Sequence, residues 1–334
     1  MRDESAEDIS ILDRFFSPTI RKEPLGTVLI ISPFNLPIQL SFGPLIGAIA
    51  AGCTAVLKPS ERCPHLATVI SQIITTSLDS DAYRVINGAV PEMQALLEEK
   101  WDKIFFIGSQ KVGKIVAAKA AETLTPVCLE LGGLNPGFVM RGADPKLAAR
   151  RLLWGKNINA GQVCASSNCV LVDRAVLGSF VEGLRENLEK FHPKGARDSE
   201  DSCRIVDRAE FGRIRKLVRE ETRGKILMGG EMNEEMCFIG LTVVQVDSVD
   251  DALVRNENFG PIFTIFTVDG VDEAIKIANS ISRTPLATSV FGSNEEIERS
   301  KTLFLSFFSS NFYVSKQLLI MPQYSHRQPQ AASP

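Results

Sequence analysis

One cysteine of the sequence stands where a side chain could act as a nucleophile. Cys164 ends the segment Asn159–Cys164, in which a Gly-Gln pair leads from an expected helix into an expected strand. A cysteine at such a junction can reach solvent, and only the thiolate form of cysteine is a strong nucleophile. Taken alone, however, most cysteines are inert packing residues. The residues elsewhere in the chain must therefore decide whether this thiol is reactive.

A carboxylate occupies an apolar run of the sequence. Glu130 lies within Val127–Leu131, whose other members are apolar or weakly polar. Burial of a carboxylate is costly, so its pKa should rise toward the range of a general base. The alternative is a buried carboxylate that only accepts bonds from backbone groups.

A glycine-containing turn follows one expected strand. The turn Gly108–Gly113 connects the strand 103–107 to a helix over 112–124. Backbone N–H groups at the start of such a helix can face a pyrophosphate. Many loops of this kind are ordinary strand-to-helix connections, so the turn alone is a weak indication.

Two charged residues follow the second expected strand, which covers residues 54–58. A doubly wound fold holds an adenosine ribose at this place, beside Lys58 and Glu61. A carboxylate there repels a 2′-phosphate, which favours NAD over NADP. Solvated turn charges are the alternative interpretation.

The elements that must position these residues alternate compact apolar strands with helices, a pattern typical of a parallel sheet covered by helices. We therefore predict an α/β fold in which a doubly wound parallel-sheet nucleotide-binding domain is followed by a second α/β domain. The expected strands cover residues 26–32, 54–58, 83–86, 103–107, 127–131, 169–172 and 262–268, and the expected helices cover 38–51, 65–78, 112–124, 148–158 and 177–190.

The composition of the whole chain agrees with a two-domain globular protein of 334 residues, with 44% apolar and 23% charged residues. A net charge of −3 argues against nucleic acid as a partner. Seven scattered cysteines favour a reducing compartment, so we expect a cytoplasmic location. No apolar stretch reaches the roughly 18 residues of a membrane span, and three dispersed histidines predict no metal site.

Four segments together resemble the signature motifs of the aldehyde dehydrogenase superfamily, in the order in which that family carries them. The resemblance covers roughly residues 24–298 and is closest to the class 3 branch, which includes fatty and aromatic aldehyde dehydrogenases. The segments Pro44–Gly52 and Trp154–Asn157 indicate that branch. The four motifs are Leu57–Glu61, Leu129–Gly133, Gly161–Cys164 and Glu257–Pro261.

The resemblance implies oxidation of an aldehyde to a carboxylic acid with NAD or NADP. Cys164 would then be the nucleophile that forms a thiohemiacetal and, after hydride transfer, a thioester. Glu130 matches the base that activates the hydrolytic water. Asn35, in Ser32–Pro37, matches the side-chain donor to the oxyanion, and the Cys164 backbone N–H is the second donor; such donors are worth about 3 to 4 kcal/mol each in other sites. A turn residue flanked by prolines is the alternative for Asn35.

The resemblance also implies a cofactor site. Lys58 and Glu61 would contact the adenosine ribose, Glu257 the nicotinamide ribose, and Phe259 the nicotinamide ring. Lys156, eight positions before Cys164, matches a lysine near the class 3 active site that has a part in proton transfer, although by itself it looks like a surface lysine. The pyrophosphate would be placed by Gly108, Ser109, Val112 and Gly113.

The domain organisation follows from the same comparison. We expect a nucleotide-binding domain over residues 1–133, a catalytic domain over 134–311 and an atypical, disordered tail over 312–334. The chain would be a version of the family fold shortened at both ends, and Leu134 replaces a lysine that is usual in the family. The family resemblance implies a homodimer, which the unusual C-terminal segment puts in question.

Two other functions compete with aldehyde oxidation. The first is a catalytically weak or inactive nucleotide-binding relative with the same fold. The second is an acylating dehydrogenase that passes the thioester to coenzyme A. The presence of Glu130 argues against the second, because that branch tends to lack a hydrolytic base.

Overall fold

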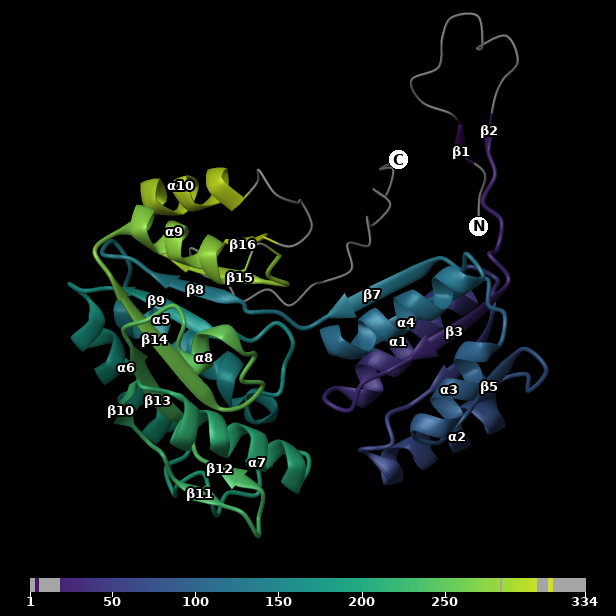
Figure 1. Cartoon of the computed structure of the whole chain (residues 1–334), viewed down its shortest axis with the longest axis horizontal. Helices are drawn as coiled ribbons and strands as arrows, with labels where there is room; N and C mark the ends of the chain where they lie inside the picture. Colours follow the sequence, from purple (N-terminus) through teal and green to yellow (C-terminus); the bar gives the residue numbers. More distant parts are fainter. Residues whose placement is uncertain (1–3, 6–18, 283, 305–311, 315–334) are drawn as a thin grey trace, which may run out of the picture. The chain divides into compact units, whose positions relative to one another are not determined.

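The computed structural model describes residues 4–5, 19–282, 284–304 and 312–314. The chain divides between Gly132 and Gly133 into two compact units, each with its own sheet (Figure 1). A separate pair of two-residue strands, β1 (Glu4–Ser5) and β2 (Thr19–Ile20), precedes the first sheet.

The first unit is built on a five-stranded parallel sheet with the order β5-β4-β3-β6-β7. This order is that of a doubly wound fold, because the chain moves outward from β3 in both directions. The predicted α/β class is thereby confirmed. The strands are β3 (Thr27–Ile31), β4 (Thr54–Lys58), β5 (Tyr83–Val85), β6 (Lys103–Gly108) and β7 (Val127–Leu131).

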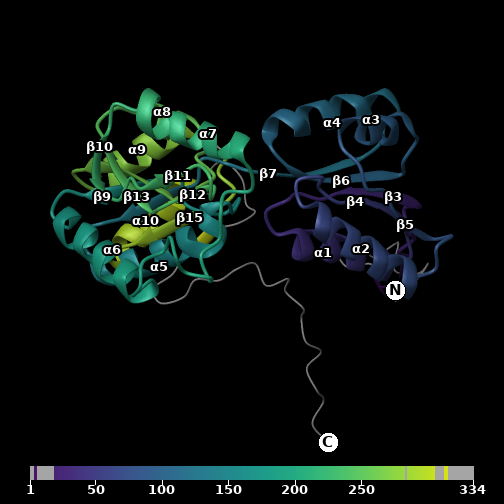
Figure 2. The same ribbon diagram turned by 90° about the horizontal axis from the view of Figure 1, so that it is seen from below.

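Both faces of this sheet are covered by helices, which explains why its strands are continuous apolar runs. Helices α1 (Pro37–Ala50) and α2 (Pro64–Ser77) lie on one face, and α3 (Val90–Glu98) and α4 (Gln110–Glu122) lie on the other (Figure 2). Alternate residues of β3 show the division: Val28 packs with residues of α1 and α2, and Leu29 packs with residues of α4.

The second unit carries a seven-stranded sheet with the order β10-β13-β14-β9-β8-β15-β16. Only the pair β10 and β13 is antiparallel among its described neighbours. The strands are β8 (Pro136–Val139), β9 (Cys169–Asp173), β10 (Lys225–Met228), β13 (Thr242–Val246), β14 (Ile262–Val268), β15 (Thr288–Phe291) and β16 (Phe312–Val314), and a small hairpin pairs β11 (Met232–Asn233) with β12 (Phe238–Ile239).

Helices cover this second sheet too. The cluster around Leu152 and Phe180 packs α5 and α6 on one face, and the cluster around Phe211 and Ile275 packs α7 and α9 on the other. The helices are α5 (Pro145–Asn157), α6 (Leu177–Phe191), α7 (Arg208–Lys216), α8 (Ala252–Arg255), α9 (Val271–Ile281) and α10 (Asn294–Phe304).

The structure corrects one expectation about the C-terminal segment. Residues 312–314, assigned above to a disordered tail, form β16 in parallel with β15. Their sequence, Phe-Tyr-Val, consists of aromatic and β-branched residues, which fit a pleated strand. Residues 315–334, the rest of the expected tail, lie outside the described residues. In the described ranges, no helix has the length and apolar character needed to cross a membrane.

Candidate active site

The candidate nucleophile follows a tight turn at the end of α5. Asn159, Ala160 and Gly161 have φ values of 50°, 51° and 74°, so three successive residues adopt the left-handed conformation that reverses the chain. Two of them carry a side chain, which makes the turn costly unless its neighbours hold it. An ideal Cβ at Gly161 would lie 2.1 Å from the carbonyl oxygen of Gly260. The turn is therefore packed against the segment Glu257–Pro261, and only glycine fits at the contact.

Gln162 anchors the turn from the other side. Its side chain is buried; its Nε2 donates to the carbonyl oxygens of Asn159 and Arg204, each at 3.0 Å, and its Oε1 accepts from the N–H of Val206 at 3.0 Å. A fully bonded buried amide fixes the backbone on both sides of it. Gln162 belongs to the predicted motif Gly161–Cys164, but its anchoring role could not be predicted, because Arg204 and Val206 lie more than forty residues away.

Cys164 is half-buried, and its carbonyl oxygen accepts a bond from Asn135. Cys169, five residues later, is buried in β9, and burial raises the pKa of its thiol to about 12. A thiol with that pKa stays protonated and unreactive near neutral pH. Between these two neighbouring cysteines, the structure therefore leaves Cys164 as the one that can serve as a nucleophile.

Lys156 is not the surface lysine that its sequence alone suggests. Its side chain is only 2% exposed, and its Nζ donates to Asn258 Oδ1 at 2.9 Å and to the Gly260 carbonyl oxygen at 3.3 Å. Burial lowers the pKa of this amine to about 7, against a smaller opposing effect of the Glu257 charge. Lys156 can therefore gain or lose a proton near neutral pH, which suits the proposed part in proton transfer.

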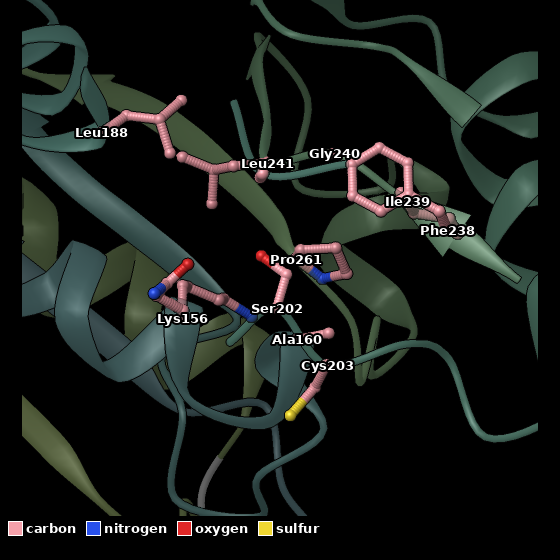
Figure 3. A pocket seen from close by; sticks show the side chains of 12 residues that line it. Lys156, Ala160, Leu188, Ser202, Cys203, Phe238, Ile239, Gly240, Leu241 and Pro261 are labelled. Atoms are coloured by element: carbon pink, nitrogen blue, oxygen red, sulfur yellow. The ribbon is translucent and has the colours of Figure 1, made fainter. Parts of the chain in front are cut away.

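Lys156 also lines a small cavity behind the nucleophile turn (Figure 3). Ala160 of the turn and Pro261 line the same cavity, together with Ser202 and Cys203 from the loop that follows α6. The cavity offers about 30 Å³ to the centres of water-sized molecules, which is enough for a water molecule.

The segment Glu257–Pro261 brings two further candidates next to the turn. Burial raises the pKa of Glu257, opposed by a bond from the Gly133 backbone and by the charge of Lys156. Phe259 has a φ of 43°, a left-handed conformation that is uncommon for a bulky side chain. Between them Asn258 is fully buried, and its N–H donates to Asn168 Oδ1 at 2.9 Å. The segment is thus held rigidly beside the nucleophile turn.

In the first unit, the candidates lie at the carboxyl edge of the parallel sheet, where doubly wound folds bind their ligands. Asn35, which is buried, stands in the turn between β3 and α1. Lys58 ends β4 with its side chain 4% exposed, and its Nζ donates to the Pro59 carbonyl oxygen at 3.1 Å and to Glu61 Oε2 at 3.3 Å. Lys58 is therefore not a solvated turn charge, whereas the Glu61 side chain is 46% exposed and fits either interpretation.

The glycine turn begins α4 at the same edge. Ser109 caps the helix, since its Oγ accepts from the N–H of Val112 at 3.3 Å. An ideal Cβ at Gly113 would lie 2.6 Å from Leu131 Cδ2, and one at Gly108 would lie 2.7 Å from the Phe106 ring. Gly113 therefore allows the first turn of α4 to approach β7, and Gly108 leaves room for the Phe106 ring of its own strand. The N–H groups at the start of α4 can receive an anion.

Glu130 lies on β7 in register with Ile107 of β6. It is half-buried, and burial raises the pKa of its carboxyl group, in the direction that the apolar run predicted. Asn35 and Glu130 belong to the first unit, and Cys164, Lys156 and Glu257 belong to the second. The structure places the residues of each unit within that unit. That the residues of both units contact one substrate stays a prediction.

Comparisons with known proteins show which family the chain matches. Residues 2–304 match the model of the aldehyde dehydrogenase family. The chain is 54% identical to the β-apo-4′-carotenal oxygenase of Neurospora crassa over 296 residues, 89% of this chain and 55% of that protein. It is 41% identical to the 4,4′-diaponeurosporen-aldehyde dehydrogenase of Staphylococcus aureus, over 83% of this chain and 60% of that one. The chain thus spans a little over half the length of these curated relatives.

The fold is also similar to those of solved aldehyde dehydrogenase structures. A substrate-bound structure of Staphylococcus aureus AldH superposes with a TM-score of 0.86 at 36% identity, and covers 94% of this chain and 67% of that one. A structure of a glyceraldehyde-3-phosphate dehydrogenase from Methanocaldococcus jannaschii, complexed with NADP, superposes with a TM-score of 0.74 at 29% identity, over 88% of this chain and 65% of that one.

Proposed function

Because the chain belongs to the aldehyde dehydrogenase family, we propose that it oxidises an aldehyde to a carboxylic acid while NAD or NADP is reduced. The observation that carries the proposal is the half-buried Cys164 on a left-handed turn that is locked between Gln162 and the segment Glu257–Pro261. A cysteine whose backbone is fixed in this way is suited to nucleophilic catalysis, and the buried Lys156 amine, whose pKa is about 7, bonds to the same segment Glu257–Pro261.

The reaction begins when the Cys164 thiolate attacks the carbonyl carbon of the aldehyde. The resulting thiohemiacetal oxyanion receives hydrogen bonds from the Asn35 side chain and from the Cys164 backbone N–H. A bound NAD or NADP would supply the hydride acceptor in this step, and loss of the hydride from the thiohemiacetal would leave a thioester on Cys164. Glu130 then takes a proton from a water molecule that attacks the thioester, and its raised pKa suits that role. The C–S bond breaks, which releases the carboxylic acid and returns Cys164 to the thiolate.

The residues of the first unit fit a dinucleotide. The N–H groups of the first turn of α4, capped by Ser109, suit the pyrophosphate. Lys58 and Glu61, paired at the end of β4, suit the hydroxyls of the adenosine ribose. In the second unit, Glu257 and Phe259 would contact the nicotinamide ribose and ring. Lys156 would return a proton to solvent during turnover, which its pKa of about 7 allows.

We further propose that the substrate is a long apolar aldehyde of the carotenal type. Support comes from the two curated relatives above, whose names specify β-apo-4′-carotenal and 4,4′-diaponeurosporen-aldehyde. The homodimer and the cytoplasmic location rest on the family resemblance and the sequence composition, and size-exclusion chromatography and cell fractionation test them.

The test is an aldehyde panel read by the absorbance of the reduced cofactor. The panel holds β-apo-4′-carotenal, a medium-chain aliphatic aldehyde and an aromatic aldehyde, each with NAD and with NADP. The proposal is supported if the cofactor is reduced and β-apo-4′-carotenal gives the highest kcat/KM of the three aldehydes. Cofactor binding without reduction of any kind would identify an inactive relative, and acyl-CoA formation on addition of coenzyme A would identify an acylating enzyme.

A further inference from the structure

A buried asparagine holds the backbone of the candidate nucleophile. Asn135 precedes β8 and is 1% exposed. Its Nδ2 donates to the carbonyl oxygens of Cys164, at 2.6 Å, and Ser166, at 3.1 Å. Its Oδ1 accepts from the N–H of Ala287 at 3.0 Å. All three bonds are long-range, and together they use both N–H groups of the side chain.

These bonds tie the segment Cys164–Ser166 to the central part of the second sheet. Ala287 directly precedes β15, which is the neighbour of β8. The backbone of Asn135 adds a further tie, because its carbonyl oxygen accepts from the N–H of Asn168 at 2.7 Å, just before β9. The segment around Cys164 is thus fastened to the starts of three adjacent strands, β15, β8 and β9.

The chemistry of the contact selects an amide. Two backbone carbonyl oxygens must receive donors and one N–H must find an acceptor, all from one short side chain. A carboxylate would place an oxygen against the Cys164 carbonyl oxygen, and an apolar residue would leave buried polar groups unpaired. Fixing that carbonyl oxygen limits rotation about the Cα–C bond of Cys164. Gln162 restrains the preceding residues, so the direction of the Cα–Cβ bond of Cys164 is fixed from both sides.

We infer that Asn135 is a positioning residue for the reaction: it sets the direction in which the Cys164 thiol and its backbone N–H face the aldehyde. This inference rests on the proposed function. Displacement of a nucleophile by about 1 Å can lower a rate by about 100-fold. For Asn135→Ala we therefore expect kcat to fall by about 10- to 100-fold while KM for the aldehyde changes little.

A merely structural role must be separated from positioning. The number of folded sites is measured by circular dichroism, and kcat is expressed per folded site. A structural role lowers the number of sites and leaves kcat per site unchanged. Positioning lowers kcat per site and increases the isotope effect with an aldehyde deuterated at C1, because hydride transfer becomes slower.

Asn187→Ala is the matched control. Asn187 is also buried, and its Nδ2 donates to the Gly183 carbonyl oxygen within helix α6 at 2.7 Å. We expect parent values of kcat per site in this variant. Asn135→Ser serves as a second variant, because its hydroxyl keeps a polar group that cannot reach both carbonyl oxygens. Failure of both Asn135 variants to fold would assign the residue to the fold alone and overturn the inference.

The rate of Cys164 alkylation needs neither aldehyde nor cofactor, so it tests the inference even if the proposed function fails. We expect this rate to fall about 10-fold in Asn135→Ala and to stay unchanged in Asn187→Ala. If the parent oxidises no aldehyde but the alkylation rates of Asn135→Ala and Asn187→Ala differ in this way, the proposed function is overturned and the positioning role is kept. Parent-like alkylation, isotope effect and kcat per site in the Asn135 variants would overturn the inference.

Discussion

Replacement of Lys156 by methionine tests the burial of an amine next to the nucleophile turn. The pKa of Lys156 falls from 10.5 to about 7 in the folded chain. Between these values the unfolded chain keeps the proton and the folded chain releases it. The free energy of unfolding of the parent must therefore rise with pH across this window. Methionine does not titrate, so the variant lacks this contribution.

The size of the effect follows from the pKa shift. Each pKa unit corresponds to about 1.4 kcal/mol, so the shift costs the folded parent about 4 kcal/mol at pH 7 and about 2 kcal/mol at pH 9. The parent should therefore gain about 2 kcal/mol of stability relative to Lys156→Met when the pH rises from 7 to 9. Terms that do not depend on pH, such as the lost bond to Asn258, cancel in this difference.

Urea denaturation of parent and variant at both pH values, followed by circular dichroism, measures this difference. Lys146→Met is the matched control. Lys146 is exposed, and its pair with Glu186 raises its pKa, so it stays protonated from pH 7 to pH 9 in both states. Its replacement should leave the pH dependence unchanged. If the free energy of unfolding has the same pH dependence in the parent and in Lys156→Met, then Lys156 is not a buried amine with a pKa of about 7.

Two further predictions concern the nucleophile turn. Cys164→Ala should abolish aldehyde oxidation and leave cofactor binding nearly intact in a fluorescence titration, whereas Cys169→Ala should stay active; substantial activity in the former would remove the nucleophile from the account. Gly161→Ala should lower the free energy of unfolding by about 2 kcal/mol or more and reduce kcat, because the added Cβ would lie 2.1 Å from the Gly260 oxygen. Gly212→Ala in α7, where a Cβ meets nothing within 4 Å, should be neutral or stabilising in the same urea assay, and similar losses in both variants would contradict the packing argument.

The sheet of the first unit could be predicted from the sequence because parallel strands bury both faces. The apolar run 54–58 coincides with β4, which has buried residues on both faces of the sheet, and the run 127–131 coincides with the edge strand β7, whose residues are only partly buried. Helices α3, α7, α8, α9 and α10 were not predicted, although α9 has an apolar face that includes the buried Ala274, Ile275 and Ala278. For α3 and α7 the sequence pattern itself is weak. Helix α3 has no fully buried residue, and α7 buries only Phe211 and Ile214 in a strongly charged segment. Their apolar periodicity is therefore too weak to detect without the tertiary contacts.

The candidate site was predictable only as far as its motifs extend. Motif resemblance suggested Cys164 and Glu130, and the apolar run around Glu130 gave the direction of its pKa shift. The burial of Lys156 could not be predicted, because its partner Asn258 lies 102 residues away in the sequence. Asn135 was not identified for the same reason: its contact with Ala287 arises only when β8 pairs with β15, and its contact with Cys164 arises only when β8 pairs with β9.

The proposed function requires a covalent intermediate on Cys164 that water hydrolyses with Glu130 as the base. Glu130→Gln tests this requirement most directly. The glutamine keeps the size of the side chain but cannot accept a proton from water. Rapid mixing of this variant with β-apo-4′-carotenal and NAD should give a burst of about one reduced cofactor per active site without steady turnover. Mass spectrometry of the peptide that contains Cys164 should then show the acyl adduct. Steady turnover at the parent rate, or a burst without an adduct on Cys164, would contradict the account.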